Sequence, residues 1–241
     1  MAEIRIGTSG WHYQHWVGRF YPDRWPASKM LAYYQERFDT VEINNSFYRL
    51  PVESALERWR ELTPSNFVFA VKGSRYLTHM KKLKDPAAGI EKFFSRIDLL
   101  KKKLGPVLFQ LPPNFGMKPE RLETFVKALP KRHRYAFEFR DESWNSPDIY
   151  ALLRRHNSAW CSYNLAGYQS PIEVTADFTY VRLHGPAGKY QGSYPDQELA
   201  QWAARIRAWR SELKAIYIYF DNDDSGYAAH NALRLRELIS K

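Results

Sequence analysis

Charged side chains occur at or near the C-terminal ends of several hydrophobic runs in this chain. Glu42 and Glu138 stand in the runs VEIN and FEFR, and His184 ends the run VRLH. Two carboxylates can supply general acid and base catalysis or flank a glycosidic bond, and a histidine can carry a proton. We therefore predict Glu42, Glu138 and His184 as catalytic residues. The structural alternative is that each glutamate pairs with a neighbouring Arg or Lys.

Other polar residues and two tryptophans occupy similar positions at or just after hydrophobic runs. Cations there could orient an anionic substrate, amide and carboxyl groups could bind hydroxyls, and tryptophans could stack on a sugar or a base. The predicted ligand-binding residues are Trp11, Asn44, Lys72, Gln110, Arg140, Trp144, Arg182 and Asp221.

The hydrophobic runs that carry these residues have the length and composition of β-strands. Eight of them alternate with helical segments at a spacing of about 30 residues, which favours parallel strands joined by crossover helices. This pattern predicts one α/β domain over residues 1–241, a (β/α)8 TIM-like barrel. An open doubly wound sheet is the alternative, but GTSGW lacks its G-x-G-x-x-G turn. The predicted strands are Glu3–Thr8, Thr40–Asn44, Phe67–Lys72, Pro106–Leu111, Arg134–Arg140, Ala159–Asn164, Phe178–His184 and Ala215–Asp221.

The segments between the runs predict outer helices, several of which begin at Ser or Pro. One interval, residues 165–177, has no clear helical pattern, so we expect the barrel to be irregular after its sixth strand. The predicted helices are Ser28–Arg37, Glu53–Leu62, Ala87–Leu104, Pro119–Leu129, Pro147–His156, Pro195–Leu213 and Gly226–Ser240.

Hydrophobic and polar residues alternate within the predicted strands. Successive side chains of a strand point to opposite faces, so one face is apolar and the other becomes polar toward the C-terminal end. Buried charges are unfavourable unless they are paired, and barrel enzymes place their active sites at the C-terminal mouth. We therefore expect the polar face to line that mouth, or alternatively to fill it with structural salt bridges. The charges expected inside are Lys72, Arg140, Arg182, Glu42, Glu138 and Asp221, with Arg5 adding one positive charge.

The net charge of the chain is strongly positive. It has 241 residues, with 36 Lys and Arg against 26 Asp and Glu, or +10 at pH 7. An anionic partner, including nucleic acid, suits this excess. The run Lys81–Lys84 and the aromatic first loop make nucleic-acid binding an alternative. Lys101–Lys103 and Lys131–Arg134 follow predicted helices, so we expect them at the opposite end, where they complement helix C-termini.

The sequence predicts a cytoplasmic location. A single cysteine, Cys161, allows no intramolecular disulfide and suits a reducing compartment. No run approaches about 18 consecutive apolar residues, and MAEIRIGTSG reads as a strand rather than a signal peptide. We therefore expect no membrane association, and the sequence gives no indication of the oligomeric state.

A metal ion at the mouth is a further alternative. Glu42, Glu138, His184 and Asp221 include carboxylate and imidazole ligands that could hold a single divalent ion. No H-x-H or H-E-x-x-H spacing accompanies them, so the sequence does not favour a metal. It identifies no other cofactor.

Seven motifs follow one another along the chain, namely GTSGW, VEINNSFYRLP, FAVKGSRYLTH, LFQLPPNF, FEFRDESW, VRLHG and YFDNDDSGYAAHNA. Together they resemble the YecE-like family, known as domain of unknown function 72, from about Ile4 to Leu238. The chain departs from the family pattern at Val41–Tyr48 (VEINSTFY in the family) and Lys72–Arg75 (KAPR). The resemblance implies a TIM-like barrel without a settled activity. Likeness of such barrels to sugar isomerases and endonuclease IV is an analogy of fold, and this mouth offers too few ligands for the trinuclear zinc cluster of endonuclease IV.

These observations predict an enzyme, such as a hydrolase or an isomerase, that acts on a small anionic or sugar-like substrate at the barrel mouth. The cations would orient the anion, one glutamate would be the general base, and His184 or the other glutamate would be the acid. The alternatives are a nucleic-acid-binding protein or phosphodiesterase and a non-catalytic binding protein.

Overall fold

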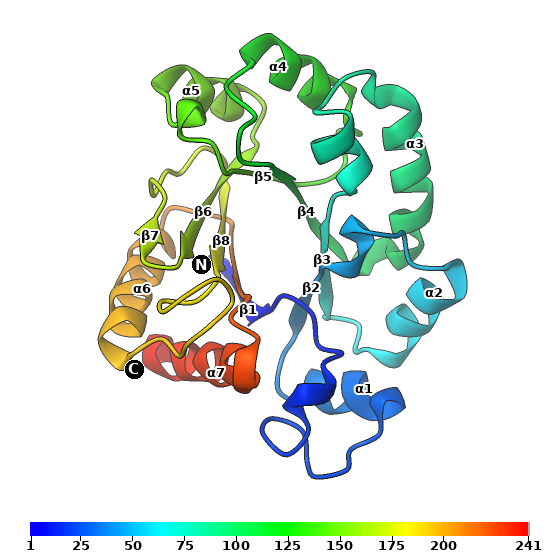
Figure 1. Ribbon diagram of the computed structural model, residues 1–241, viewed down its shortest axis with the longest axis vertical. Coiled ribbons are helices and arrows are strands. Elements are labelled where there is room, and N and C mark those ends of the chain that lie inside the picture. Colours follow the sequence, from blue (N-terminus) through cyan, green and yellow to red (C-terminus); the bar gives the residue numbers. More distant parts are fainter. Residues whose placement is uncertain (241) are drawn as a thin grey trace.

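Eight parallel strands surround a common axis in the computed structural model, which describes residues 1–240 (Figure 1). Their order is β1-β9-β8-β6-β5-β4-β3-β2. This arrangement confirms the predicted TIM-like barrel, and every predicted strand is present with its ends within two residues. The strands are β1 (Glu3–Thr8), β2 (Thr40–Ile43), β3 (Val68–Lys72), β4 (Leu104–Leu111), β5 (Tyr135–Phe139), β6 (Ala159–Leu165), β8 (Phe178–Leu183) and β9 (Ala215–Phe220).

A ring of helices covers the outside of the barrel (Figure 1). All seven predicted helices are present, although most are shorter than predicted. The prediction Ala87–Leu104 is wrong in its second half, because the α-helix ends at Ile97 and a 3-10 segment follows in which Lys101 leaves the helical conformation. The helices are α1 (Met30–Gln35), α2 (Glu53–Leu62), α3 (Pro86–Ile97), α4 (Pro119–Ala128), α5 (Pro147–Arg155), α6 (Asp196–Trp209) and α7 (Tyr227–Ser240).

The barrel is irregular after β6, as predicted. The chain forms a hairpin there, in which the short strand β7 (Tyr168–Gln169) runs antiparallel to β6. A left-handed residue, Ala166, and Gly167 make the turn between them. No helix covers this interval, so the mouth of the barrel beside β6 is bordered by loops. Within the described residues, no helix combines the length and the apolar character needed to cross a membrane.

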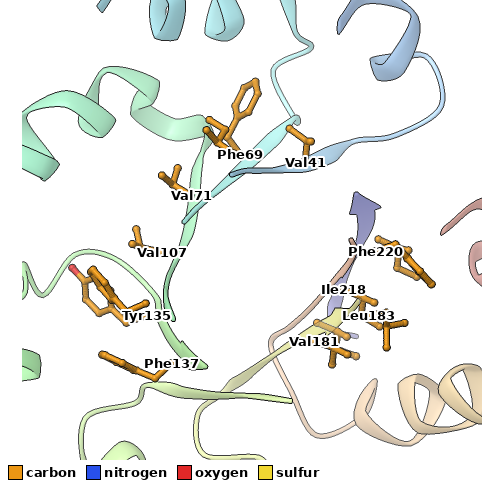
Figure 2. Close-up of a cluster of buried hydrophobic side chains, with 14 of the residues drawn as sticks. Val41, Phe69, Val71, Val107, Tyr135, Phe137, Val181, Leu183, Ile218 and Phe220 are labelled. Atoms are coloured by element: carbon orange, nitrogen blue, oxygen red, sulfur yellow. The ribbon is translucent and has the colours of Figure 1, made fainter. Parts of the chain in front are cut away.

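The apolar face of the strands points outward. Val71, Val107, Val181 and Ile218 are fully buried, and Figure 2 shows such side chains directed away from the barrel interior and toward the helices. The interior at mid-height holds a second cluster that includes Leu108, which is also fully buried. The alternation in the sequence therefore sorts the side chains as predicted, and it leaves the upper interior to the polar residues.

The barrel closes between β1 and β2 through a single bridge. Ser9 pairs with Glu42, and the Gly10 N–H donates to the Glu42 carbonyl over 2.8 Å. Just below, a Cβ atom at Gly7 would lie 2.4 Å from the Thr40 carbonyl oxygen. Only glycine therefore allows the two strands to approach this closely.

Gly7→Ala is expected to force this seam apart and to destabilise the fold by about 1–3 kcal/mol, the usual effect of overpacking. Urea denaturation measures the loss. Gly116→Ala is the matched control, since the nearest atom to its added Cβ would lie at 3.7 Å. Equal stability of the two variants would contradict a close-packed seam.

Candidate functional site

Arg182 lies at the centre of the upper barrel interior. It is fully buried, and its guanidinium contacts carboxylates from three other strands or strand ends. Nη2 donates to Glu42 over 2.8 Å and to Asp221 over 3.0 Å, and Nη1 donates to Glu138 over 3.1 Å. Nε makes a second bond to Glu42 over 3.1 Å. Four of the residues predicted from the sequence thus form one network.

Both glutamates are fully buried below the mouth and have all their partners inside the protein. Glu42 also accepts from the Ser9 hydroxyl over 2.5 Å and from the Tyr180 hydroxyl over 2.6 Å. Burial alone would raise the pKa of Glu138, but Arg140 and Arg182 together hold that pKa well below its usual value. A carboxylate in this state is a weak base, which does not favour Glu138 as the general base. The catalytic roles of Glu42 and Glu138 stay predictions.

His184 connects Asp221 to the two arginines. Its Nδ1 lies 2.9 Å from Asp221, and its Nε2 lies 2.8 Å from Arg140 Nη2 and 3.3 Å from Arg182 Nη1. Because a guanidinium can only donate, Nε2 must accept, and the imidazole proton is on Nδ1 and is donated to Asp221. Burial would raise the pKa of Asp221, but Arg182 and this hydrogen bond lower it. His184 is fully buried. Its role as a general acid stays a prediction.

Arg140 lies at the upper edge of the network, with its side chain 10% exposed. Its Nε donates to Glu138 over 2.5 Å, its Nη2 bonds His184, and the guanidinium stacks on the Tyr163 ring at 4.3 Å. Among residues 1–240 these bonds use Nε and Nη2, so Nη1 has both hydrogens available. Arg140 is therefore held rigidly while it keeps donors for a ligand.

Lys72, at the end of β3, is the exceptional charge of the site. It is only 6% exposed, yet within residues 1–240 its ammonium makes no ion pair or hydrogen bond, and it lies 4.6 Å above the Phe47 ring. Burial, reinforced by the Arg182 charge, lowers the pKa of Lys72 to about 8, and the nearby carboxylates do not compensate. The three carboxylates are engaged by Arg182, Arg140 and His184, which explains why Lys72 is left unpaired.

A pocket of about 370 Å³ opens at the mouth above Arg140. Gln110 and Arg140 line it from β4 and the end of β5, Tyr163 lines it from β6, and Lys189 and Tyr190 line it from the loop after β8. The Tyr190 ring lies 5.6 Å from the His184 ring and covers it. Glu142 also lines this pocket, whereas Lys72 is not among its lining residues. The mouth thus combines Arg140 and Lys189 with aromatic side chains and one carboxylate, beside the buried network.

Two predicted residues lie elsewhere. Asn44 and Trp11 line a separate, larger pocket of about 780 Å³ between the first loop and α2. The larger pocket lacks the ion-paired network, so we assign the candidate site to the smaller one. Arg5 is also outside the site, because it pairs with Glu3 and Asp39 near the N-terminal end of β1. Without Arg5, the charges predicted inside the barrel are three positive (Lys72, Arg140 and Arg182) and three negative (Glu42, Glu138 and Asp221).

Trp144 is in the hydrophobic core. Its side chain is fully buried, stacks on Phe139 at 4.7 Å and donates from Nε1 to the Phe115 carbonyl over 2.5 Å. This burial overturns the prediction that Trp144 stacks on a ligand. A tryptophan directly after a strand either reaches the mouth or folds back under the next helix, and only tertiary packing selects between them.

Several residues of the site were not predicted. Ser9 and Tyr163 follow the same inward alternation as their neighbours, so that pattern could have found them. Lys189 and Tyr190 lie on an irregular loop that brings them back over the mouth, and no periodic signal marks them.

One basic run, Lys101–Lys103, lies near a helix C-terminus, as the sequence predicted. Lys103 donates from Nζ to carbonyl oxygens of Arg60 and Thr63 at the C-terminal end of α2, as cations near helix C-termini do. Part of the net charge thus stabilises helix ends. In the part of the chain that the structure describes, no three His, Cys, Asp or Glu side chains are arranged to hold a metal ion.

Comparisons with known proteins agree with this architecture. Residues 5–241 match the family model described as protein of unknown function DUF72. The chain is 29% identical to UPF0759 protein YunF of Bacillus subtilis, over 98% of this chain and 94% of that protein. It is also 30% identical to UPF0759 protein YecE of Escherichia coli K12, over 57% of this chain and 48% of YecE.

Solved structures give the same assignment. The crystal structure of a DUF72 family protein from Thermotoga maritima superimposes with a TM-score of 0.90 and 29% identity, and it covers 99% of this chain and 100% of its own. A DUF72 family protein from Enterococcus faecalis has the same fold, with a TM-score of 0.78 and 22% identity, over 100% of this chain and 99% of its own. The chain therefore belongs to the DUF72 family of proteins of unknown function.

Proposed function

We propose that this protein is an enzyme that binds a small anionic substrate, such as a sugar phosphate or a sugar acid, at the barrel mouth. The observation that carries the proposal is Lys72. Lys72 is 6% exposed, and within residues 1–240 its ammonium has no counter-ion. A nearly buried cation without a counter-ion is unfavourable, and such a group is a candidate for binding a ligand or taking part in a reaction. An anionic group bound beside Lys72 would supply the missing partner.

Arg140 supports the same ligand class. Glu138, His184 and Tyr163 hold its guanidinium on three sides. Nη1 makes no hydrogen bond within residues 1–240, so it can donate to an oxyanion. Donors that are fixed before the ligand arrives lose little entropy on binding. Lys189 and the hydroxyl and amide groups of the mouth pocket then suit the polar body of a sugar-like substrate.

The chemical step in this proposal depends on Lys72 rather than on the glutamates. A group with a pKa of about 8 can give and take a proton near neutral pH. The Arg182 network would act as a rigid scaffold that positions Arg140. Its charges would also maintain the electrostatic field around Lys72. Glu42, Glu138 and His184 would then be positioning residues.

Calorimetric titration with glucose 6-phosphate, gluconate and inorganic phosphate tests the proposal. Lys189→Ala removes a cation of the mouth pocket without touching the buried network, and we expect it to weaken binding of a sugar phosphate about tenfold. Lys214→Ala is the matched control, because Lys214 pairs with Asp177 near the N-terminal end of β9. Equal affinities in the two variants, or binding that is unchanged in Lys72→Met, would refute the proposed site.

Binding should also depend on pH. Lys72 carries its charge below about pH 8 and loses it above. The affinity for an anion is therefore expected to fall as the pH rises from 7 to 9.5, and the fall should be absent in Lys72→Arg. A pH-independent affinity of the wild-type protein would exclude Lys72 from the binding site.

A further inference from the structure

A second pocket lies outside the proposed active site. It has a volume of about 780 Å³ and lies between the first loop, the start of α1 and the outer part of α2. It shares no lining residue with the mouth pocket. Its size falls within the range of small-molecule sites, so its chemistry indicates what it could bind.

The walls of this pocket are aromatic and apolar. Trp11 and Trp59 meet edge to face at 5.0 Å, and Leu31, Ile43 and Leu62 contribute aliphatic surface. Trp59 is only partly buried, and Tyr48 is 77% exposed. Such walls suit a planar ring, which can make offset or edge-to-face contacts with indole.

Asn44 adds a specific polar requirement. Its Oδ1 is buried and, among the residues described, has no hydrogen-bond partner. An orphaned buried acceptor is uncommon and destabilising, and exchanging the amide oxygen and nitrogen would leave an orphaned donor instead. A ligand hydroxyl or N–H can satisfy the amide in either orientation, and Asn44 lines the pocket from the end of β2.

The charge of the pocket selects the sign of the ligand. Arg58 extends from α2 into the lining, and none of the described residues that line the pocket is Asp or Glu. His12 also lines the pocket. An anionic group is therefore the complementary partner for Arg58.

We propose that this pocket is a second ligand site, which binds a small aromatic molecule carrying an anionic group and a hydroxyl or N–H donor. The ring lies against Trp11 and Trp59, the donor bonds Asn44, and the anion pairs with Arg58. This inference does not depend on the function assigned to the barrel mouth.

Nuclear magnetic resonance titration of the full chain tests it with para-hydroxybenzoate, benzoate and phenyl phosphate. The indole N–H signals of Trp11 and Trp59, identified with Trp11→Phe and Trp59→Phe, are expected to shift at millimolar ligand, and that of Trp202 on α6 is not. The uncharged para-hydroxybenzamide should bind about tenfold more weakly than para-hydroxybenzoate, the ratio expected for one charge-assisted contact.

Matched variants separate the contributions. Arg58→Gln should weaken para-hydroxybenzoate about tenfold, whereas Arg155→Gln, on the exposed face of α5, should not. Asn44→Ala should abolish the preference for para-hydroxybenzoate over benzoate. Lys72→Met should leave these affinities unchanged, so failure of the mouth site would not mimic failure here. The proposal is overturned if none of the three anions shifts the two indole signals, or if Arg58→Gln binds them as well as wild type.

Discussion

Arg182→Met is expected to destabilise the protein more than any other single substitution at the mouth. It removes the cation that contacts Glu42, Glu138 and Asp221 and leaves three carboxylates in a nearly water-free interior. Breaking one buried ion pair typically costs about 3–5 kcal/mol, and a domain is stable by only about 5–15 kcal/mol. We therefore expect a loss of at least about 4 kcal/mol in urea denaturation, or failure to fold at neutral pH.

The pH dependence shows whether the carboxylates cause this loss. Glu138 and Asp221 have lowered pKa values, so they stabilise the wild-type fold above their usual pKa values of 4.5 and 3.8. That contribution disappears as the pH falls through their folded pKa values. The stability gap between wild type and Arg182→Met should thus narrow in acid. Arg154→Met, which breaks only the surface pair with Glu173, is the control and should change little. A gap that is independent of pH would mean that lost packing, not charge, explains the effect.

Lys72→Met is expected to stabilise the fold, in contrast to Arg182→Met, and to abolish anion binding. The pKa of Lys72 is about 8 in the folded state against 10.5 in the unfolded chain. The difference means that the charged form destabilises the fold by about 3 kcal/mol at pH 7. Methionine has a similar length and no charge, so urea denaturation at pH 7 should show a more stable variant.

The same linkage predicts how the difference varies with pH. Between pH 8 and 10.5 the unfolded chain binds a proton that the folded protein does not, so wild-type stability gains relative to the variant as the pH rises. The two proteins should therefore converge near pH 10.5. Lys189→Met is a useful control for stability, because the Lys189 side chain is exposed. This variant should show neither the gain in stability at pH 7 nor the change of that gain with pH. A Lys72→Met variant that is less stable than wild type at pH 7 would show that Lys72 is a structural cation.

The strands and their two faces could be predicted because the signal is local. Alternation along β5, where Ala136 and Glu138 oppose Tyr135, Phe137 and Phe139, depends only on the two-residue repeat of an extended chain. Repetition of that pattern at regular intervals then predicts a barrel with charges at its mouth. The helices were predicted less well at their ends. The α-helix α3 ends at Ile97, and no glycine or proline in residues 98–104 marks that end in the sequence.

The pairing of the charges could not be predicted, because it depends on which strands face each other across the barrel. Glu42 and Arg182 are 140 positions apart, and their bidentate contact exists only because β2 and β8 lie on opposite sides of a narrow interior. Alternation assigned both residues to the inside and left open whether they bind a ligand or each other. Trp144 illustrates the same limit, since its burial against Phe139 follows from the path of the chain into α5.

What the sequence determined by itself is therefore the barrel, the orientation of its strand faces and the set of charges at its mouth, all of which follow from short-range periodicity. Only the tertiary structure decided that Arg182 pairs with the three carboxylates, that Lys72 has no ion-pair partner among the residues that the structure describes, and that Asn44 lies in a different pocket. The physical reason is that the free energy of a buried charge depends on all the groups around it, and those groups come from strands that are distant in the sequence.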